Sequence, residues 1–367
     1  MGDKKDEIIS LQLDLIRKMT ENNIRRLSDD IWGPERRRNE EKKSPQNDLS
    51  AFSFTDVGKP ETTASDGSGN ENEKKNDVLP AENIDDLLAE LDSYIGLGKV
   101  KKEVRNLINM AKVYKLRLDN DLPNTDVSLH MVFSGNPGTG KTVIARFMAR
   151  VYHSLGLLSV GKLIEVDRSG LVAGYIGQTA IKTAKVLEEA KGSVLFIDEA
   201  YTLTSKTEND FGFEAVDTVL KAMEDNRDDL VVIVAGYTEL MEDFIDSNPG
   251  LRSRFNKYVD FADYTGDEMA DIFAFNCRKA AYILTPEAED EVRAYLTAAA
   301  DAAGEFGNAR GVRNIFEKIL TEQANRIAAM ESVSRDDLMT ITKADTVHAL
   351  YPEGKADTDG TNVCPEE

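Results

Sequence analysis

The feature that most constrains this chain is an apolar run that passes directly into a glycine-rich loop and then into a helical pattern. Residues 129–134 read Leu-His-Met-Val-Phe-Ser, a run typical of a buried strand. The loop Gly-Asn-Pro-Gly-Thr-Gly follows at 135–140, and residues 141–149 have the composition of a helix. A strand, a tight loop and a helix in this order form the repeating unit of a parallel sheet, so the sequence predicts an α/β domain.

The loop matches the Walker A pattern, Gly-x-x-x-x-Gly-Lys-Thr. Glycines let the backbone wrap around phosphate oxygens, so that successive N–H groups and the positive end of the next helix face the anion. Lys141 can reach the β- and γ-phosphates of a nucleotide, and the Thr142 hydroxyl can ligate Mg²⁺. The sequence therefore predicts a site for ATP and Mg²⁺ whose loop residues are Gly135, Asn136, Pro137, Gly138, Thr139, Gly140, Lys141 and Thr142.

A second apolar run, residues 194–197, ends in two carboxylates, Asp198 and Glu199. Ligands bind at the carboxyl ends of strands in open α/β sheets, so Asp198 is expected to hold the hydration shell of Mg²⁺. Glu199 is expected to accept a proton from the attacking water, which is the role of a general base. A strand that ends in two acids is common by itself, but together with the loop it predicts ATP hydrolysis.

Beyond residue 81, short β-branched runs alternate with longer helical segments, which predicts a parallel sheet covered on both faces. The expected strands are Leu129–Phe133, Leu163–Val166, Val194–Ile197, Leu230–Val234 and Tyr258–Phe261. After Asp263 the strand pattern ends and three or four helices are expected, two of them with capping signals at Thr265 and at Thr285-Pro286. The sequence thus predicts a core domain at 81–262, a small all-helical domain at 263–350 and a polar tail at 351–367.

The first 80 residues have a different character. Apolar residues at helical spacing, such as Ile8, Leu11 and Leu15, predict an amphipathic helix within residues 1–32. An apolar stripe reports burial and not what covers it, so this helix is expected either to dock on its own body or to contact a partner. Residues 33–80 are rich in charged and small polar residues, which predicts a disordered linker.

Charge and cysteine content argue against several classes of protein. The 367 residues carry 45 Lys and Arg against 66 Asp and Glu, a net charge of −21, which disfavours binding to nucleic acid or anionic lipid. The two cysteines, Cys277 and Cys364, lie far apart, which argues against a disulfide framework and indicates a reducing compartment. No apolar run approaches the ~20 residues that cross a bilayer, so a cytoplasmic protein without a membrane partner is expected.

Further motifs resemble the AAA+ ATPases over residues from about 81 to 350, and within them the group that contains the red-type Rubisco activase CbbX and stage V sporulation protein K. The segments that carry this resemblance are Asp92–Leu97, Gly174–Thr179, Asp198–Tyr201, Ala235–Tyr237 and Asn248–Phe255. The resemblance implies a P-loop NTPase (AAA+) parallel-sheet domain, an all-helical lid domain and a hexamer of identical subunits.

The same resemblance implies which residues contact the base and the lid side of the nucleotide. Ile95, Gly96 and Leu97 correspond to the segment that lines the adenine pocket. Arg310, with Arg313 as the alternative, corresponds to sensor 2, which reaches the nucleotide from the lid and reports hydrolysis as a lid rotation.

The resemblance also implies an arginine finger, which acts on the ATP of the neighbouring subunit. Arg254 is the better match and Arg252 is the second choice. A guanidinium keeps its charge and spans two phosphate oxygens, which suits it to phosphoryl transfer. Sensor 1 departs from the usual pattern, because no polar Asn ends the fourth strand, and Tyr237 is the candidate for orienting the attacking water.

Tyr175 and Ile176 match the family's pore loop, which grips a polypeptide in the centre of the ring. Glycines flank the pair at 174 and 177, and they give the aromatic ring no reason to be buried. The alternative is that the ring folds back onto its own domain.

These motifs predict an ATPase that works in a hexameric ring to remodel or partially thread a protein client. Two other classes stay open at this point. One is a nucleic-acid-associated AAA+ ATPase of the loader type, against which the acidic composition and the aromatic loop argue. The other is an ATP-gated assembly scaffold with little turnover, against which the complete set Lys141, Asp198, Glu199 and Arg254 argues.

Overall fold

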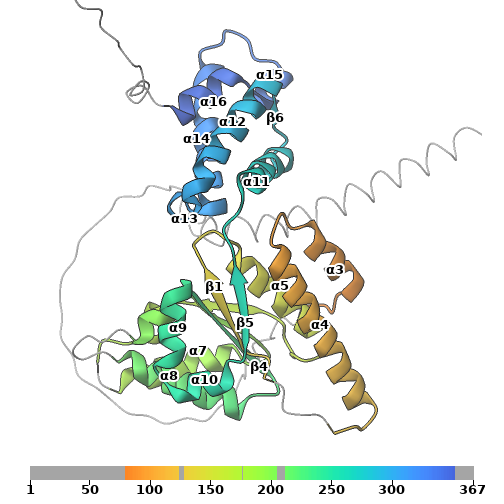
Figure 1. The fold of residues 1–367 in the computed structure, drawn as a ribbon, viewed down its shortest axis with the longest axis vertical. Helices are drawn as coiled ribbons and strands as arrows, with labels where there is room; N and C mark the ends of the chain where they lie inside the picture. Colours follow the sequence, from red (N-terminus) through yellow and green to blue (C-terminus); the bar gives the residue numbers. More distant parts are fainter. Residues whose placement is uncertain (1–78, 124–127, 176, 205–210, 352–367) are drawn as a thin grey trace, which may run out of the picture. The chain divides into compact units, whose positions relative to one another are not determined.

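Five parallel strands form the central sheet in the order β2–β3–β4–β1–β5 (Figure 1). The structure is a computed structural model, and it describes residues 79–123, 128–175, 177–204 and 211–351. The sequence predicts all five strands, and the predicted parallel α/β fold is confirmed. The strands are β1 (Met131–Gly135), β2 (Leu163–Val166), β3 (Ser193–Ile197), β4 (Leu230–Gly236) and β5 (Lys257–Phe261).

Successive residues of the central strands alternate between two hydrophobic clusters, one on each face of the sheet. In β1, Met131 and Phe133 belong to one cluster and Val132 belongs to the other. β3 and β4 are buried along their whole length. A strand that is buried on both faces needs a continuous apolar run, which is why these segments are recognisable in the sequence.

Helices cover both faces of the sheet (Figure 1). The helices that pack in the first cluster come just before or just after β1 in the sequence. The helices that pack in the second cluster come between β2 and β5 in the sequence. The first set is α3 (Ile84–Ser93), α4 (Gly98–Asp119) and α5 (Lys141–Ser154). The second set is α6 (Arg168–Leu171), α7 (Gln178–Glu189), the 3₁₀ helix η2 (Ala200–Thr204), α8 (Gly212–Asp225), α9 (Thr238–Asp246) and α10 (Pro249–Arg254).

The parallel register brings the carboxyl ends of four strands to one edge of the sheet. Gly135, the last residue of β1, lies opposite Phe261, the last residue of β5. Its neighbour Ser134 lies opposite Gly236 at the end of β4, and Ile197 at the end of β3 pairs with Val234. The loops that follow these strands therefore meet at the edge where ligands bind in sheets of this kind.

The region after Asp263 is helical, as predicted, and both predicted caps are present. Thr265 and Glu268 form a capping box, and the Thr285 side chain accepts a hydrogen bond from the N–H of Ala288. Between Asp263 and residue 351, the last that the structure describes, four helices have eight residues or more, and three shorter elements were not predicted. They are α11 (Gly266–Lys279), α12 (Pro286–Ala299), η3 (Ala300–Ala302), α13 (Ala303–Phe306), α14 (Asn308–Ala328), α15 (Arg335–Met339) and α16 (Lys343–Leu350).

The prediction that the strands end before Asp263 is wrong in one detail. β6 (Ile283–Leu284) and β7 (Thr340–Ile341) pair in parallel as a second, two-stranded sheet. Two residues are too few to show the alternation of a strand in the sequence. Gln323 Nε2 donates to the carbonyl oxygen of Thr340 at 2.9 Å, so a buried side chain of α14 fixes the start of β7.

Several predictions concern residues outside those described. The N-terminal helix within 1–32, the linker up to residue 78 and the tail beyond residue 351 are among them, and they stay predictions. The predicted limits of the core and of the helical domain also stay predictions. Within the ranges that the structure covers, no helix combines the length and the apolar character needed to cross a membrane.

Candidate nucleotide site

The loop between β1 and α5 has a backbone that glycine adopts most readily. Gly135, Gly138 and Gly140 have φ angles of +142°, +76° and +97°. Two of them also touch other backbone closely. A Cβ on Gly135 would lie 2.3 Å from the carbonyl oxygen of Phe261, and one on Gly138 would lie 2.2 Å from that of Gly307. Both the shape of the loop and its neighbours therefore require glycine.

Lys141, the first residue of α5, lies across the loop. Its Nζ donates to the carbonyl oxygens of Gly135 at 2.7 Å and Asn136 at 2.8 Å. An ammonium group has three N–H donors, so these two bonds leave a third for a phosphate oxygen. Thr139 is fully buried, and its hydroxyl donates to the Asn136 carbonyl oxygen at 2.7 Å, which closes the loop on itself.

The charges that act on Lys141 show which groups surround the loop. Burial lowers the pKa of Lys141, and the positive charge of Arg310 lowers that pKa further. The carboxylates of Asp198, Asp263 and Glu199 act in the opposite direction and raise it. Charges shift a pKa in this way only over short distances. Contacts agree for two of these groups: Asp263 accepts from Asn136 Nδ2 of the loop at 3.0 Å, and the backbone nitrogen of Arg310 lies 3.0 Å from the position of a Cβ on Gly138.

Thr142 and Asp198 are the residues that could hold Mg²⁺. Thr142 lies half-buried in the first turn of α5, and Asp198 lies half-buried directly after β3. In the described part of the chain, no three His, Cys, Asp or Glu side chains form a cluster that could hold a metal ion alone. A threonine hydroxyl and one carboxylate are oxygen donors of the kind that Mg²⁺ takes together with phosphate oxygens and waters.

Glu199 has an exposed side chain on a strained backbone. Its φ is +48°, a conformation that few residues with a Cβ adopt. Its carbonyl oxygen accepts hydrogen bonds from the Thr202 N–H at 2.9 Å and the Thr202 hydroxyl at 2.7 Å, and its N–H donates to Asp198 Oδ1 at 3.0 Å. The backbone is thus fixed while the carboxylate stays open to water, as a general base requires.

Arg254 lies at the opposite end of β1 from the loop of its own chain. The Ser128 hydroxyl, ahead of β1, donates to the Arg254 carbonyl oxygen at 2.7 Å. A strand rises about 3.3 Å per residue, so roughly 15 Å separate the two ends of β1. That span exceeds the reach of an arginine side chain, so the structure does not bring Arg254 to the loop of the same chain.

The two arginines of α10 have different partners. Arg254 Nη2 donates to Glu224 Oε2 at 3.1 Å, and its Nε is buried with no hydrogen-bond partner among the described residues. Arg252 pairs with Asp246, and its side chain is 67% exposed. The Arg254 side chain is 30% exposed and keeps one donor unused, whereas Arg252 is mostly exposed and paired, which favours Arg254 over Arg252.

The segment Ile95-Gly96-Leu97 adjoins the loop. Gly96 and Leu97 have φ angles of +64° and +57°, so the chain turns sharply between α3 and α4. Leu97 Cδ1 lies 3.6 Å from the position of a Cβ on Gly140, and the Tyr264 ring lies 3.0 Å from that of a Cβ on Gly96. The predicted adenine-pocket segment therefore lies beside both the loop and the start of the helical region.

Arg310 is the arginine of α14 that lies near the loop. Its backbone nitrogen lies 3.0 Å from the position of a Cβ on Gly138, and its charge acts on Lys141. Arg313, one turn further along, donates from Nε to Glu317 Oε1 at 2.9 Å on the same helix. The geometry favours Arg310 as the predicted sensor.

Three residues at the loop were missed by the sequence-based predictions: Asp263, Tyr264 and Asn308. The Tyr264 hydroxyl donates to the Thr139 carbonyl oxygen at 3.4 Å, although the two residues are 125 positions apart. Nothing local in the sequence reports such a contact. A signal did exist for Asn308, because it follows Gly307 at a helix start and asparagine tolerates its φ of +53°.

Comparisons with known proteins agree with this geometry. The model of the ATPase family associated with various cellular activities (AAA) matches residues 131–263, and the AAA lid domain model matches residues 265–356. Protein CbbX of Cereibacter sphaeroides is 44% identical to this chain, over 71% of this chain and 84% of its own. The chain belongs to the AAA ATPases.

Two further relatives of this AAA ATPase show its place in the family. The chloroplastic ribulose bisphosphate carboxylase/oxygenase activase of Cyanidioschyzon merolae is 44% identical over 71% of this chain and 89% of its own. Stage V sporulation protein K of Bacillus subtilis is 37% identical over 75% of this chain and 84% of its own. The resemblance to this group of AAA ATPases is confirmed, and the helices after Asp263 are the AAA lid.

Tyr175 projects from the core of this AAA ATPase. Its side chain is 74% exposed, so the ring does not fold back onto its own domain. A Cβ on Gly174 or Gly177 would meet no atom within 4 Å, so both glycines border open space. The base of the loop is fixed by the buried Thr179, whose hydroxyl accepts from the Ala173 N–H at 3.0 Å. Ile176, the second predicted pore residue, lies outside the described residues.

Tyr237, the candidate for sensor 1, follows β4 directly. Its ring centroid lies 6.2 Å from that of Tyr201, which is two positions after Glu199. The residue is 38% exposed and lies at the same edge of the sheet as Glu199. This position suits a side chain that orients an attacking water.

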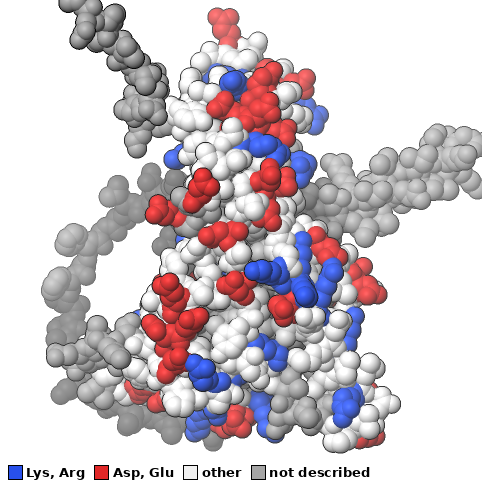
Figure 2. Space-filling view, in the orientation of Figure 1, with Lys and Arg blue, Asp and Glu red and all other residues white. Residues whose placement is uncertain are grey.

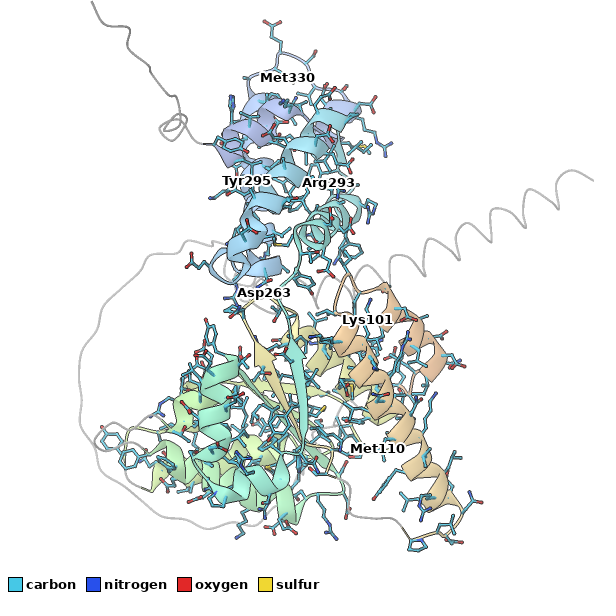
Figure 3. The ribbon with its side chains drawn as sticks, viewed as in Figure 1. Lys101, Met110, Asp263, Arg293, Tyr295 and Met330 are labelled. Carbon is cyan, nitrogen blue, oxygen red and sulfur yellow. The ribbon has the colours of Figure 1, made fainter. Side chains whose placement is uncertain are left out.

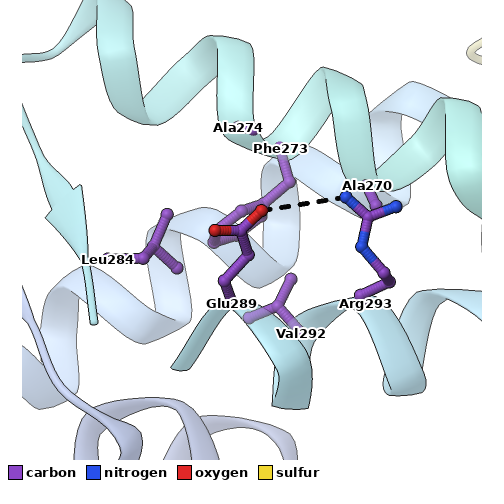
Figure 4. A pocket seen from close by; sticks show the side chains of 7 residues that line it. All are labelled: Ala270, Phe273, Ala274, Leu284, Glu289, Val292 and Arg293. Atoms are coloured by element: carbon purple, nitrogen blue, oxygen red, sulfur yellow. Dashed lines mark ion pairs between the residues drawn. The ribbon is translucent and has the colours of Figure 1, made fainter. Parts of the chain in front are cut away.

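A cavity in the AAA lid is too small to compete as a ligand site. It lies between α11, β6 and α12 beside Phe273, Leu284 and Val292, and its volume is about 10 Å³ (Figure 4). Arg293 Nη2 and Glu289 Oε1 lie 3.8 Å apart at its rim. This volume holds about one water molecule, so the loop at the sheet edge is the better candidate for a nucleotide.

Proposed function

We propose that this AAA ATPase hydrolyses Mg·ATP in a hexameric ring and uses the Tyr175 loops to remodel or partially thread a protein client. The observation that carries the proposal is the exposed Tyr175 ring between two glycines that border open space. An exposed ring between two glycines that border open space can contact a polypeptide from outside its own domain, as the matching pore-loop residues do in the family.

The residues at the sheet edge would divide the hydrolysis between them. Mg²⁺, when bound with ATP, neutralises charge on the β- and γ-phosphates. Lys141 would donate to a phosphate oxygen through its remaining N–H, and Thr142 and Asp198 would hold the metal and its waters. Glu199 removes a proton from the attacking water, and its exposed carboxylate is accessible for that step.

The position of Arg254 supports a site shared between subunits. Arg254 lies beside the start of β1, whereas the loop follows its end. An arginine finger in this chain therefore serves the site of another copy. A head-to-tail contact of this kind generates a closed ring when the rotation between subunits closes.

The client proposed here is a polypeptide. Figure 2 shows a face on which acidic and basic side chains are interspersed, and the chain carries a net charge of −21. A polyanion such as DNA is repelled by this net charge, whereas a polypeptide can be gripped by aromatic rings. A relative is named as a Rubisco activase, and Rubisco as the client here requires a host that makes the red-type enzyme.

Tyr175→Ala is expected to bind Mg·ATP and to assemble like the unaltered protein, but to bind polypeptide about tenfold more weakly, because an aromatic contact is lost. The probe is a fluorescent, permanently unfolded polypeptide, and the measurement is its anisotropy in the presence of ATP. Tyr175→Phe keeps the ring and is the matched control, with binding within about twofold of the unaltered protein.

Two results would count against the proposal. One is equal binding of the probe by Tyr175→Ala and the unaltered protein, and the other is no binding by the unaltered ring. Salt-dependent binding of a DNA probe in the same assay would favour the loader type of AAA ATPase instead.

A further inference from the structure

The AAA lid contacts the nucleotide loop at the start of α14, where the side-chain amide of Asn308 is buried. We infer that Asn308 is a positioning residue that ties the AAA lid to the loop through Asp263, so that nucleotide affinity depends on this contact. The inference rests on the proposed ATP site and names a residue that controls it.

Asn308 is fully buried at the start of α14, and its side chain is fully engaged. Its Nδ2 donates to Asp263 Oδ1 at 2.8 Å and to the Pro137 carbonyl oxygen at 3.3 Å. Its Oδ1 accepts from the Tyr264 N–H at 2.9 Å. The side-chain amide of one lid residue therefore contacts both the loop and the segment after β5.

Asp263 extends this contact to a second point on the loop. Figure 3 labels Asp263 where the chain leaves β5 and enters the lid. Its two carboxylate oxygens accept from Asn136 Nδ2 at 3.0 and 2.9 Å, while Oδ1 also accepts from Asn308. Hydrogen bonds to an ionised group are stronger than those between neutral groups. We call the line Asn136–Asp263–Asn308 the lid clamp.

Groups of the lid and of the segment after β5 also hydrogen-bond to the backbone carbonyl groups of the loop. The carbonyl oxygens of residues 137–139 accept from Asn308 Nδ2, from the Ala309 N–H at 3.2 Å and from the Tyr264 hydroxyl at 3.4 Å. A loop binds phosphate through its N–H groups, which requires its carbonyl groups to point elsewhere. The lid and the segment after β5 supply the donors for these carbonyl groups, and they thereby pre-organise the loop for an anion.

This arrangement links the nucleotide to the lid in both directions. If the contact between lid and loop raises the affinity of the loop for nucleotide by some factor, then bound nucleotide must stabilise that contact by the same factor. ATP is therefore expected to slow amide hydrogen exchange in residues 307–312, which include the Ala309 N–H.

The test replaces the amide of Asn308 by a carboxylate. Asn308→Asp keeps the size of the side chain and tolerates a positive φ, but it removes both N–H donors and places a second carboxylate against Asp263. The Kd for Mg·ATP, measured by calorimetry on the full chain, is expected to rise about tenfold or more. In this variant ATP is expected to leave the exchange of residues 307–312 unchanged.

A charge swap and a neighbouring site provide the controls. The double variant Asn308→Asp with Asp263→Asn restores one amide against one carboxylate, and it is expected to recover most of the lost affinity. Asn314→Asp adds the same charge at an exposed position of the same helix, and its Kd is expected to stay within about twofold. Thermal melting of each variant checks that it folds. If Asn308→Asp does not fold, Asp263→Asn alone is expected to weaken ATP binding about fivefold.

The outcomes separate this inference from the proposed function. If the unaltered protein binds Mg·ATP and folded Asn308→Asp binds it equally well, the lid clamp does not position the loop. A swap variant that binds no better than Asn308→Asp contradicts the Asp263 contact. If the unaltered protein does not bind Mg·ATP at all, the proposed function fails first.

Discussion

Glu199→Gln is expected to bind Mg·ATP and to assemble, but to hydrolyse ATP about 10²- to 10⁴-fold more slowly than the unaltered protein. An amide has nearly the same shape as the carboxylate, but it cannot accept the proton of the attacking water. The strained backbone at φ +48° is held by Thr202 and Asp198, so the substitution leaves the end of β3 in place. The measurement is phosphate release at saturating ATP.

A second exposed glutamate provides the control for this variant. Glu188 lies near the end of α7, its side chain is 69% exposed, and it pairs with Lys191 rather than facing the loop. Glu188→Gln removes the same charge and is expected to keep the rate within about twofold. A rate for Glu199→Gln within about threefold of the unaltered protein would show that another group takes the proton.

Arg254→Ala is expected to lower hydrolysis by about 10³- to 10⁵-fold, the range found for arginine fingers in other enzymes, while Mg·ATP still binds. The loss of its ion pair with Glu224 has little effect on stability, because that pair is partly exposed. Mixing Arg254→Ala with Lys141→Ala subunits is expected to restore activity. In a random equal mixture about a quarter of the sites combine an intact lysine with an intact neighbouring arginine.

Arg252→Ala is the matched control, because Arg252 lies on the same short helix and pairs with Asp246. Its rate is expected to stay within about threefold, since an exposed ion pair contributes little. Two results would contradict a shared site. One is the absence of any rescue at every mixing ratio, and the other is a larger loss for Arg252→Ala than for Arg254→Ala.

The sequence predicts those parts of the fold in which residues adjacent in the chain have the same structural requirement, such as burial or a positive φ angle. β3 and β4 are buried on both faces, so each is a continuous apolar run and each is recognisable. The loop glycines are recognisable for the same reason, since positive φ angles at Gly138 and Gly140 exclude most other residues. β6 and β7 could not be recognised in the sequence, because each has only two residues and such a segment shows no strand pattern.

The parts that could not be predicted depend on contacts between distant segments. Asp263 lies 127 positions after Asn136, and the pairing of their side chains is set by the register of β5 against β1. Asn308 reaches the loop only because the lid packs there. The sequence already favours Arg254 over Arg252, but it does not show their partners, Glu224 and Asp246, which lie on other elements.

The central claim is that the loop at 135–142 binds Mg·ATP through Lys141, and calorimetry of the full chain tests it most directly. The unaltered protein is expected to bind Mg·ATP at one site per chain with a Kd below about 1 mM. Lys141→Ala is expected to bind at least tenfold more weakly, because it loses a charge-assisted hydrogen bond to phosphate, which is typically about 1.5–3 kcal/mol. No heat of binding with the unaltered protein, or equal affinity in Lys141→Ala, would contradict the account.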